Sequence, residues 1–389
     1  MSRKKIKMRA IVIISLLFLA YFLLAAKPVP KETILTSKWI SSFENEDPVY
    51  LTNSDGKPNT ADSAGTHLLP FTLGYLFGYI DTTGHFAVNK IKTNEIGLSK
   101  NMWTEYSAEP SSIEIKNIAG ETIINIENTK GYPVLLDNRV FILGSEQNSL
   151  SEIDTNGNVK WSYEFGSILT DMDAAAGLVA AASVDGVLEI LDSQGKRIYF
   201  FQPGGSRIEA IYGCAISGNG SRIGIISGYD PQRFLLLERF GTEEGEYRVV
   251  YHEFLDRGYR RPVNIQFIDE DRRVVFERQG GIGCYNTRSR RCIFVPLDGE
   301  LAAIDKSGDK GMLFLITRHQ YQPTQKELIG IRLPRDRGFS SLQNQNLVFL
   351  KAPYKSEVVY LGRTQTSSGQ SMLIAGGGTA LISFILDEK

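Results

Sequence analysis

Short apolar runs separated by turn residues follow one another along most of this chain. The best-defined stretch, 168–201, contains the runs 178–183 and 187–192 and has turn glycines at Gly186 and Gly195. No helical spacing of apolar residues continues for ten or more positions between these runs. The pattern therefore predicts four short antiparallel strands in about 40 residues, joined by tight turns.

One turn type recurs along the chain. Its copies end at Gly84, Gly120, Gly157 and Gly195, which lie 36, 37 and 38 residues apart. Three of the four copies begin with Asp after an apolar residue: Ile80-Asp81, Ile153-Asp154 and Leu191-Asp192. An Asp at the first turn position binds backbone N–H groups further on, and Gly adopts the positive φ that the turn requires. The side chains of the turn are explained by local structure, and the period predicts a repeat array of small sheets.

An all-β propeller of four-stranded blades fits this period. Counting the units gives eight blades, with seven as the alternative because the first is poorly defined before Leu68. The last unit, 371–386, is one strand short. Since a closed ring leaves no sheet incomplete, we expect the segment 34–43 to supply the missing strand.

The amino terminus predicts a membrane attachment. Residues 1–9 are basic, residues 10–26 are uncharged and apolar, and Lys27-Pro28-Val29-Pro30 follows. We interpret 1–9 as a cytoplasmic segment, 10–26 as one transmembrane signal anchor or a cleaved signal peptide, 27–67 as a tether containing the closing strand, and 68–389 as the propeller. The predicted location is the bacterial inner membrane, single-pass with the propeller in the periplasm, or the periplasm itself after cleavage.

Charge and composition exclude several function classes. The net charge is -1 and the pI is near 6.5, so we expect no nucleic-acid partner. The four histidines are scattered, and no nucleophile elbow or phosphate-binding loop is present. Asp154, Asn156 and Asn158 alternate like the start of a calcium loop, but Val159 replaces the required Gly and Phe165 the required Glu. The sequence predicts no catalytic residue, cofactor or metal site.

Two groups of charged residues are candidate sites. Asp171 and Asp173 could point the same way from one strand and serve acid–base work or bind a cation near the propeller channel, although aspartates at such positions more often cap or wet the channel. An arginine group in the sixth unit could dock an acidic partner, or could form a salt-bridged surface with the interleaved acids. The candidate partner-binding arginines are Arg257, Arg260, Arg261, Arg288, Arg290 and Arg291.

The cysteines and several aromatic residues complete the candidates. Cys284 and Cys292 flank a turn and could form a disulfide outside the cytoplasm, or could be two small core residues; Cys214 is left over. Exposed aromatic residues suit a binding surface, and three are expected in the long loops of the last two units: Tyr321, Phe339 and Tyr354.

The run 153–163, with its Asp, turn Gly and Trp161, resembles the repeat of pyrroloquinoline-quinone-type propellers. The dehydrogenases of that superfamily carry a Trp in nearly every blade and a calcium site, whereas this chain keeps only Trp161 at the blade position. It looks more like the non-enzymatic branch, similar to the propeller component of the bacterial outer-membrane assembly machinery, whose blades hold protein partners. It departs from that component because a lipid-attachment cysteine is absent.

These observations favour a membrane-tethered, extracytoplasmic propeller that acts as a protein-binding scaffold in the cell envelope. The expected partners are envelope proteins and, through the N-terminal helix, the membrane. Two alternatives stay open: a quinone-dependent oxidoreductase or other enzyme with a site at the channel, and a small-molecule or glycan sensor.

Overall fold

The computed structural model describes residues 13–16, 18–21, 33–44, 48–50, 67–241, 245–307, 311–334 and 347–388. The chain divides into two compact units, Met1–Thr36 with Leu386–Lys389, and Ser37–Ile385.

In the first unit, residues 13–16 and 18–21 are helical and carry exposed apolar side chains, among them Ile14 and Phe18. Within the described residues, no helix is long and apolar enough to cross a bilayer. The basic segment 1–9 lies outside the described residues.

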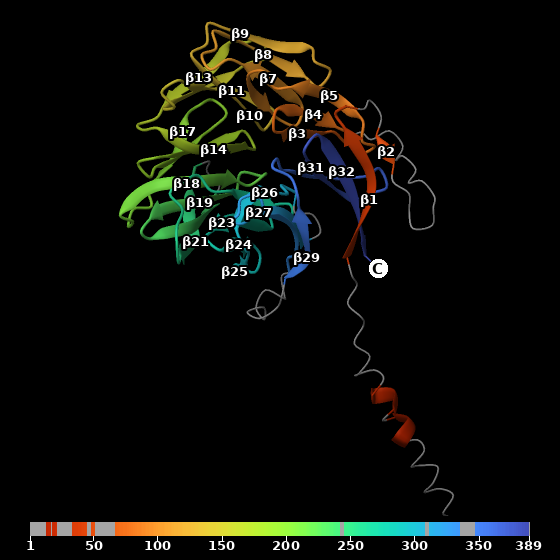
Figure 1. Ribbon diagram of the computed structural model, residues 1–389. Coiled ribbons are helices and arrows are strands. Elements are labelled where there is room, and N and C mark those ends of the chain that lie inside the picture. Colours follow the sequence, from red (N-terminus) through yellow and green to blue (C-terminus); the bar gives the residue numbers. More distant parts are fainter. Residues whose placement is uncertain are drawn as a thin grey trace, which may run out of the picture. The chain divides into compact units, whose positions relative to one another are not determined.

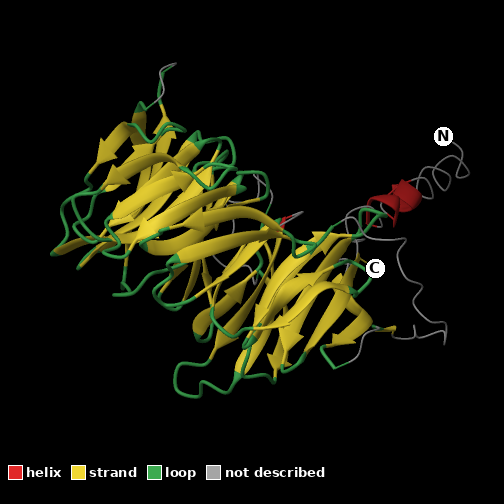
Figure 2. Ribbon diagram, turned by 90° about the horizontal axis from the view of Figure 1, so that it is seen from above, coloured by secondary structure: helices red, strands yellow, loops and turns green. Residues whose placement is uncertain are grey.

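The second unit is built from eight antiparallel sheets that follow one another along the chain (Figures 1 and 2). Blade 1 contains β3 (Leu69–Leu73), β4 (Leu76–Ile80) and β5 (Phe86–Ile91). Blade 2 contains β6 (Glu95–Leu98), β7 (Met102–Tyr106), β8 (Ser112–Asn117) and β9 (Thr122–Glu127). Blade 3 contains β10 (Gly131–Leu136), β11 (Arg139–Gly144), β12 (Ser149–Ile153) and β13 (Val159–Glu164). Blade 4 contains β14 (Leu169–Ala175), β15 (Leu178–Ser183), β16 (Leu188–Leu191) and β17 (Arg197–Phe201).

The remaining blades complete the series. Blade 5 contains β18 (Ile208–Ile216), β19 (Arg222–Tyr229), β20 (Gln232–Arg239) and β21 (Tyr247–Leu255). Blade 6 contains β22 (Ile265–Ile268), β23 (Arg273–Arg278), β24 (Gly281–Asn286) and β25 (Arg291–Pro296). Blade 7 contains β26 (Glu300–Ile304), β27 (Met312–Arg318), β28 (Lys326–Arg332) and β29 (Val348–Tyr354). Blade 8 contains β30 (Tyr360–Gln365), β31 (Ser371–Gly377), β32 (Ala380–Glu388), β1 (Thr33–Ser42) and β2 (Val49–Tyr50).

The N-terminal strand closes the ring. β1 lies between β32 and β2, so the first strand of the chain belongs to the last blade (Figure 1). The Trp39 N–H donates to Ser383 Oγ at 3.2 Å, and the Phe43 N–H donates to the Thr379 carbonyl at 3.1 Å. These contacts confirm the predicted closing strand, and the eight sheets confirm the count of eight blades.

The recurrent turns form as the sequence predicts. In the β12–β13 turn, Asp154 Oδ1 accepts from the backbone N–H groups of Asn156 at 2.8 Å and Asn158 at 2.9 Å. Gly157 has a φ of +84°, which favours glycine over any residue with a Cβ. The backbone N–H of Asn158 contributes most to holding the pKa of Asp154 below its ordinary value. Asp154 therefore serves the turn, as its spacing indicates.

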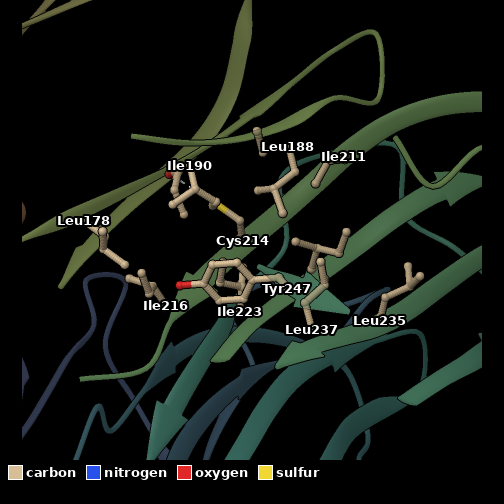
Figure 3. Packing of buried hydrophobic residues seen from close by; sticks show 13 residues of the cluster. Leu178, Leu188, Ile190, Ile211, Cys214, Ile216, Ile223, Leu235, Leu237 and Tyr247 are labelled. Atoms are coloured by element: carbon tan, nitrogen blue, oxygen red, sulfur yellow. Dashed lines mark hydrogen bonds between the residues drawn. The ribbon is translucent and has the colours of Figure 1, made fainter. Parts of the chain in front are cut away.

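Neighbouring blades pack through apolar faces. Figure 3 shows the cluster between blades 4 and 5, where Leu188 and Ile190 of β16 lie close to Ile211 and Cys214 of β18. All four side chains are buried. Both faces of β15 and β16 are covered, so β15 is apolar up to its last residue, and the one charged residue of β16, Glu189, is buried and paired with Arg197 at 3.1 Å. The outer strand β17 is only partly buried. Burial between sheets is therefore the main stabilising contribution at this junction.

Two tryptophans mark equivalent junctions. Trp161 of β13 lies against Gly195 in the next blade, where an added Cβ would come within 2.4 Å of Trp161 Cδ2. Trp39 of β1 lies against Gly84 of blade 1 in the same way, with a Cβ-to-Cδ2 distance of 2.8 Å. The closing strand thus makes the contact that the last strand of an ordinary blade makes.

Candidate functional site

Antiparallel strands place successive connections at alternate ends of a blade. One end of each blade carries the loops between blades and, in blades 3 to 7, also the turn between the second and third strands. We call this end the interblade-loop face. The opposite end carries the remaining hairpin turns, and we call it the hairpin-turn face. In blade 6 the loop 256–264 and the turn 279–280 lie on the first face, whereas the turns 269–272 and 287–290 lie on the second.

The six candidate arginines do not form one surface. Three precede β22 on the interblade-loop face, and three lie in or after the β24–β25 turn on the hairpin-turn face. The strands β22, β23 and β24 separate the two sets, and an odd number of strands leads to opposite ends. The expectation of a single arginine cluster is therefore corrected to two groups: Arg257, Arg260 and Arg261 on one face, and Arg288, Arg290 and Arg291 on the other.

Two hollows meet on the interblade-loop face. One of about 690 Å³ lies between the loops of blades 6 and 7, and one of about 440 Å³ lies between the loops of blades 4, 5 and 6. Asp256, Arg257 and Gln279 line both hollows. We call the two together the blade 5–7 groove; its other polar and aromatic lining residues include Arg207, Tyr229, Tyr259, Arg260, Arg278, Phe294, His319 and Tyr321.

A buried glutamine side chain holds the loop between β21 and β22, which carries the arginines of the groove. Gln232, at the start of β20, is 1% exposed. Its Nε2 donates to the Tyr259 carbonyl at 3.0 Å, and its Oε1 accepts from the Tyr259 N–H at 3.2 Å. Both backbone groups of Tyr259 are thereby satisfied by one buried amide, which fixes the loop between β21 and β22. Burial also raises the pKa of the Tyr259 hydroxyl to about 12, so it stays a neutral donor.

Most charges along the groove are paired. Arg278 is buried beneath the groove and donates to Glu253 at 3.0 Å. Arg261 donates to Glu277 at 2.7 Å, and this bond raises the pKa of the Arg261 guanidinium. These pairs hold the floor in place.

Arg257 and Arg260 differ from their neighbours. Both side chains are exposed, and neither forms an ion pair with a carboxylate of the described part of the chain. The Arg260 guanidinium lies 4.3 Å from the centre of the Tyr229 ring, a cation–π contact that orients it without neutralising it. The groove therefore presents two guanidinium groups to solvent.

The aromatic candidates differ in their exposure and position. Tyr321, in the loop between β27 and β28, is 82% exposed and lines the groove. Tyr354 is partly buried and its hydroxyl donates to the Gly376 carbonyl. Phe339 lies outside the described residues.

The side chains of Asp171 and Asp173 extend from β14 to the first strand of the neighbouring blade. Asp171 Oδ2 accepts from the Cys214 N–H at 2.7 Å, and Asp173 Oδ2 accepts from the Ile216 N–H at 2.9 Å. These N–H groups belong to β18, the first strand of blade 5, at an edge with no strand partner. Burial raises the pKa of Asp171 to about 6 and also raises the pKa of Asp173. The two carboxylates cap a strand edge at the blade 4–5 junction, a role that the sequence did not indicate.

Cys284 and Cys292 are free thiols. In the ladder Cys284 pairs with Ile293, and Tyr285 pairs with Cys292. Directly opposed residues share a face and successive residues alternate, so the two sulfurs lie on opposite faces of the blade 6 sheet. Of the two alternatives, the structure has two core residues and no disulfide: each thiol packs into a different interblade core.

Over the described ranges, no three His, Cys, Asp or Glu side chains come together in a way that would hold a metal ion. Gln232 is one of the groove residues that the sequence did not indicate. It precedes the apolar run 234–237, and nothing local points to its partner 27 residues away.

Comparison with known proteins agrees with this architecture. The sequence matches, over residues 1–367, the model of a family described as beta-propeller protein. A protein of Treponema pallidum (strain Nichols), described as uncharacterized, is 25% identical over 290 residues, 75% of each chain.

Similar solved structures include the computationally designed Ika8 protein, with a TM-score of 0.54 and 12% identity over 84% of this chain and 98% of that one. BamB from Moraxella catarrhalis has a TM-score of 0.52 and 12% identity over 90% of this chain and 97% of that one. At this identity the two structures support the fold. Because the family model spans most of the sequence, the chain belongs to this β-propeller protein family.

Proposed function

We propose that this protein is a membrane-tethered, extracytoplasmic scaffold that binds another envelope protein through the blade 5–7 groove. The observation that carries the proposal is a rigid, solvent-facing groove in which exposed Arg and Tyr side chains lie together. Arg and Tyr are the residue types that most often dominate protein–protein binding energy.

Preorganisation supports a binding role. The loop that carries Arg257 and Arg260 is held by Gln232, and Arg260 is oriented by Tyr229. A loop that is already ordered loses little conformational entropy on association. Such a loop favours a partner that is recognised repeatedly in one geometry.

The membrane tether rests on the amino-terminal pattern. A basic stretch before a long apolar run favours an anchor whose following domain lies outside the cytoplasm. The exposed apolar side chains of the helical residues, such as Ile13 and Phe18, suit a lipid environment. The resemblance to non-enzymatic quinone-type propellers agrees with a scaffold role.

The proposal is tested on the full-length chain expressed in its own host. Membranes are treated with a mild crosslinker, solubilised, and the tagged chain is purified with its adducts. The variant Arg257→Glu/Arg260→Glu reverses two exposed groove charges and should abolish the specific adduct. The control Arg288→Glu/Arg291→Glu makes the same change on the hairpin-turn face and should leave it intact. Recovery of no adduct from the wild-type chain, or equal adducts from both variants, would reject the groove as the binding site.

A further inference from the structure

We propose that the blade 5–7 groove recognises an extended peptide segment rich in carboxylates, with Arg257 and Arg260 binding its acidic side chains. The inference rests on the proposed function and names the chemistry of the segment that the groove binds.

The argument begins with the charges of the groove. Each described carboxylate along it already has a cation within ion-pair distance. The pairs are Asp230 with Arg207 at 2.9 Å, Asp256 with Arg278 at 3.5 Å, Asp298 with Lys351 at 3.1 Å, and Glu277 and Glu300 with Arg261 at 2.7 and 3.8 Å. Arg261 and Arg278 each pair with two carboxylates, so the positive and negative charges along the groove balance in number. Arg257 and Arg260 have no carboxylate partner among the described residues, and their guanidinium groups are open to carboxylates of another molecule.

These two unpaired guanidinium groups have the geometry that carboxylates match. A guanidinium is planar, stays charged and donates in parallel to both oxygens of a carboxylate. Arg257 lines both hollows, and Arg260 lines the smaller one beside Tyr229. Two acidic side chains of one segment can therefore be bound in the middle of the groove.

The shape indicates an extended segment. The smaller hollow begins at Arg207, between blades 4 and 5, and the larger one ends at Tyr321, in blade 7. The groove follows the ring across loops of successive blades, and Arg257 lies where its two parts join. A chain in an extended conformation reaches along such a path, because each of its residues adds about 3.3 Å.

The aromatic surfaces favour a peptide over an acidic carbohydrate. Sugars stack on open ring faces, but guanidinium groups already lie over the rings of Tyr229, Tyr259 and Phe294, at 4.3, 4.2 and 4.6 Å. Tyr321 and the exposed part of Phe294 instead offer apolar surface that side chains of a peptide can cover. The occupant thus combines carboxylates with apolar groups.

The test is fluorescence anisotropy with the purified full-length chain in detergent at low ionic strength. The probe is a short fluorescein-labelled peptide in which Glu alternates with Ser and Tyr, and the comparison peptide has Gln in place of every Glu. We expect binding of the Glu peptide to be at least about tenfold tighter, because two charge-assisted hydrogen-bonded contacts are lost in the Gln peptide. Arg257→Glu/Arg260→Glu should weaken the Glu peptide by a similar factor, and Arg288→Glu/Arg291→Glu should not.

Three results would overturn the inference. The Glu and Gln peptides bind equally, both charge-reversal variants lose equal affinity, or a short oligogalacturonate displaces the labelled peptide at a lower concentration than unlabelled Glu peptide does. The last result would assign the groove to an acidic carbohydrate. Failure here is distinguishable from failure of the proposed function: if the crosslinked envelope adduct still requires Arg257 and Arg260 while the Glu peptide does not bind, the groove remains the binding site and only the acidic-peptide assignment falls.

Discussion

A buried ion pair joins blade 7 to blade 8, the blade that closes the ring. Arg363 of β30 and Asp305, which follows β26, are 1% and 0% exposed and lie 3.0 Å apart. The Arg363 guanidinium also donates to the Met312 carbonyl at 2.8 Å and, through Nε, to Ser371 Oγ at 2.7 Å. Removing one partner leaves the other charge buried without its counter-ion, and this typically costs about 3–5 kcal/mol.

We expect Arg363→Met to lower the free energy of unfolding by that amount. An unfolding entropy of roughly 2.1 cal/mol/K per residue gives about 0.7 kcal/mol/K for the roughly 350 residues of Ser37–Ile385, so the thermal midpoint should fall by roughly 4 to 7 °C. The assay is urea unfolding followed by far-UV circular dichroism, with calorimetry for the midpoint.

A double-mutant cycle tests whether the loss of unfolding free energy comes from a buried charge that has lost its counter-ion. Asp305→Asn alone should also destabilise, because it leaves the buried guanidinium with neutral acceptors. The double variant Arg363→Met/Asp305→Asn should lose less than the sum of the single losses, by more than about 1.5 kcal/mol, since neither charge is then stranded. Strict additivity, or a loss below about 1 kcal/mol for Arg363→Met, would refute the reasoning.

Three further predictions follow from the junctions and thiols. Gly195→Ala should lower the thermal midpoint, because its φ is +73° and the new Cβ would collide with the Trp161 indole at 2.4 Å; an unchanged midpoint would contradict the packing. The pKa of Asp171 is raised to about 6 by burial, so the folded chain binds more protons than the unfolded chain between about pH 4 and 6. The free energy of unfolding of the wild-type chain should therefore fall, relative to that of Asp171→Asn, as the pH rises through that window. Urea midpoints of the two chains that change in parallel with pH would contradict a buried carboxylate at this position. Alkylation in denaturant without reductant should modify all three cysteines, whereas a mass with one modified thiol would reveal a Cys284–Cys292 bond.

Local chemistry explains why the repeat could be predicted from the sequence. The turns ending at Gly84, Gly120, Gly157 and Gly195 are set by neighbouring residues, and all four join the last two described strands of their blades. The closing strand was predictable for a different reason. The final unit lacked one strand, and the apolar piece around Trp39 was available to fill it.

The grouping of the arginines required strand parity in addition to sequence distance. Arg257 and Arg288 are 31 positions apart, and only the odd number of strands between them places them at opposite ends of blade 6. The sequence left open whether Cys284 and Cys292 form a disulfide or are two core residues, for a similar reason. A shift of one residue in the β24–β25 register decides whether Cys284 faces Cys292 or Ile293.

The groove itself depends on contacts between residues far apart in the sequence. Its floor is built by Gln232 reaching Tyr259 and by Arg278 reaching Glu253, pairs separated by 27 and 25 positions. Neither pair has a periodic or local signature. A binding surface of this kind is visible only once the loops of consecutive blades are placed side by side.

The most direct test of the central claim is site-specific photocrosslinking in intact cells. A benzophenone amino acid replaces Tyr321, which is 82% exposed on the interblade-loop face, and in a second strain it replaces Arg290 on the hairpin-turn face. Our account predicts a discrete, high-molecular-mass adduct from position 321 and none from position 290. An adduct from position 290 alone, or adducts of equal yield from both positions, would contradict it.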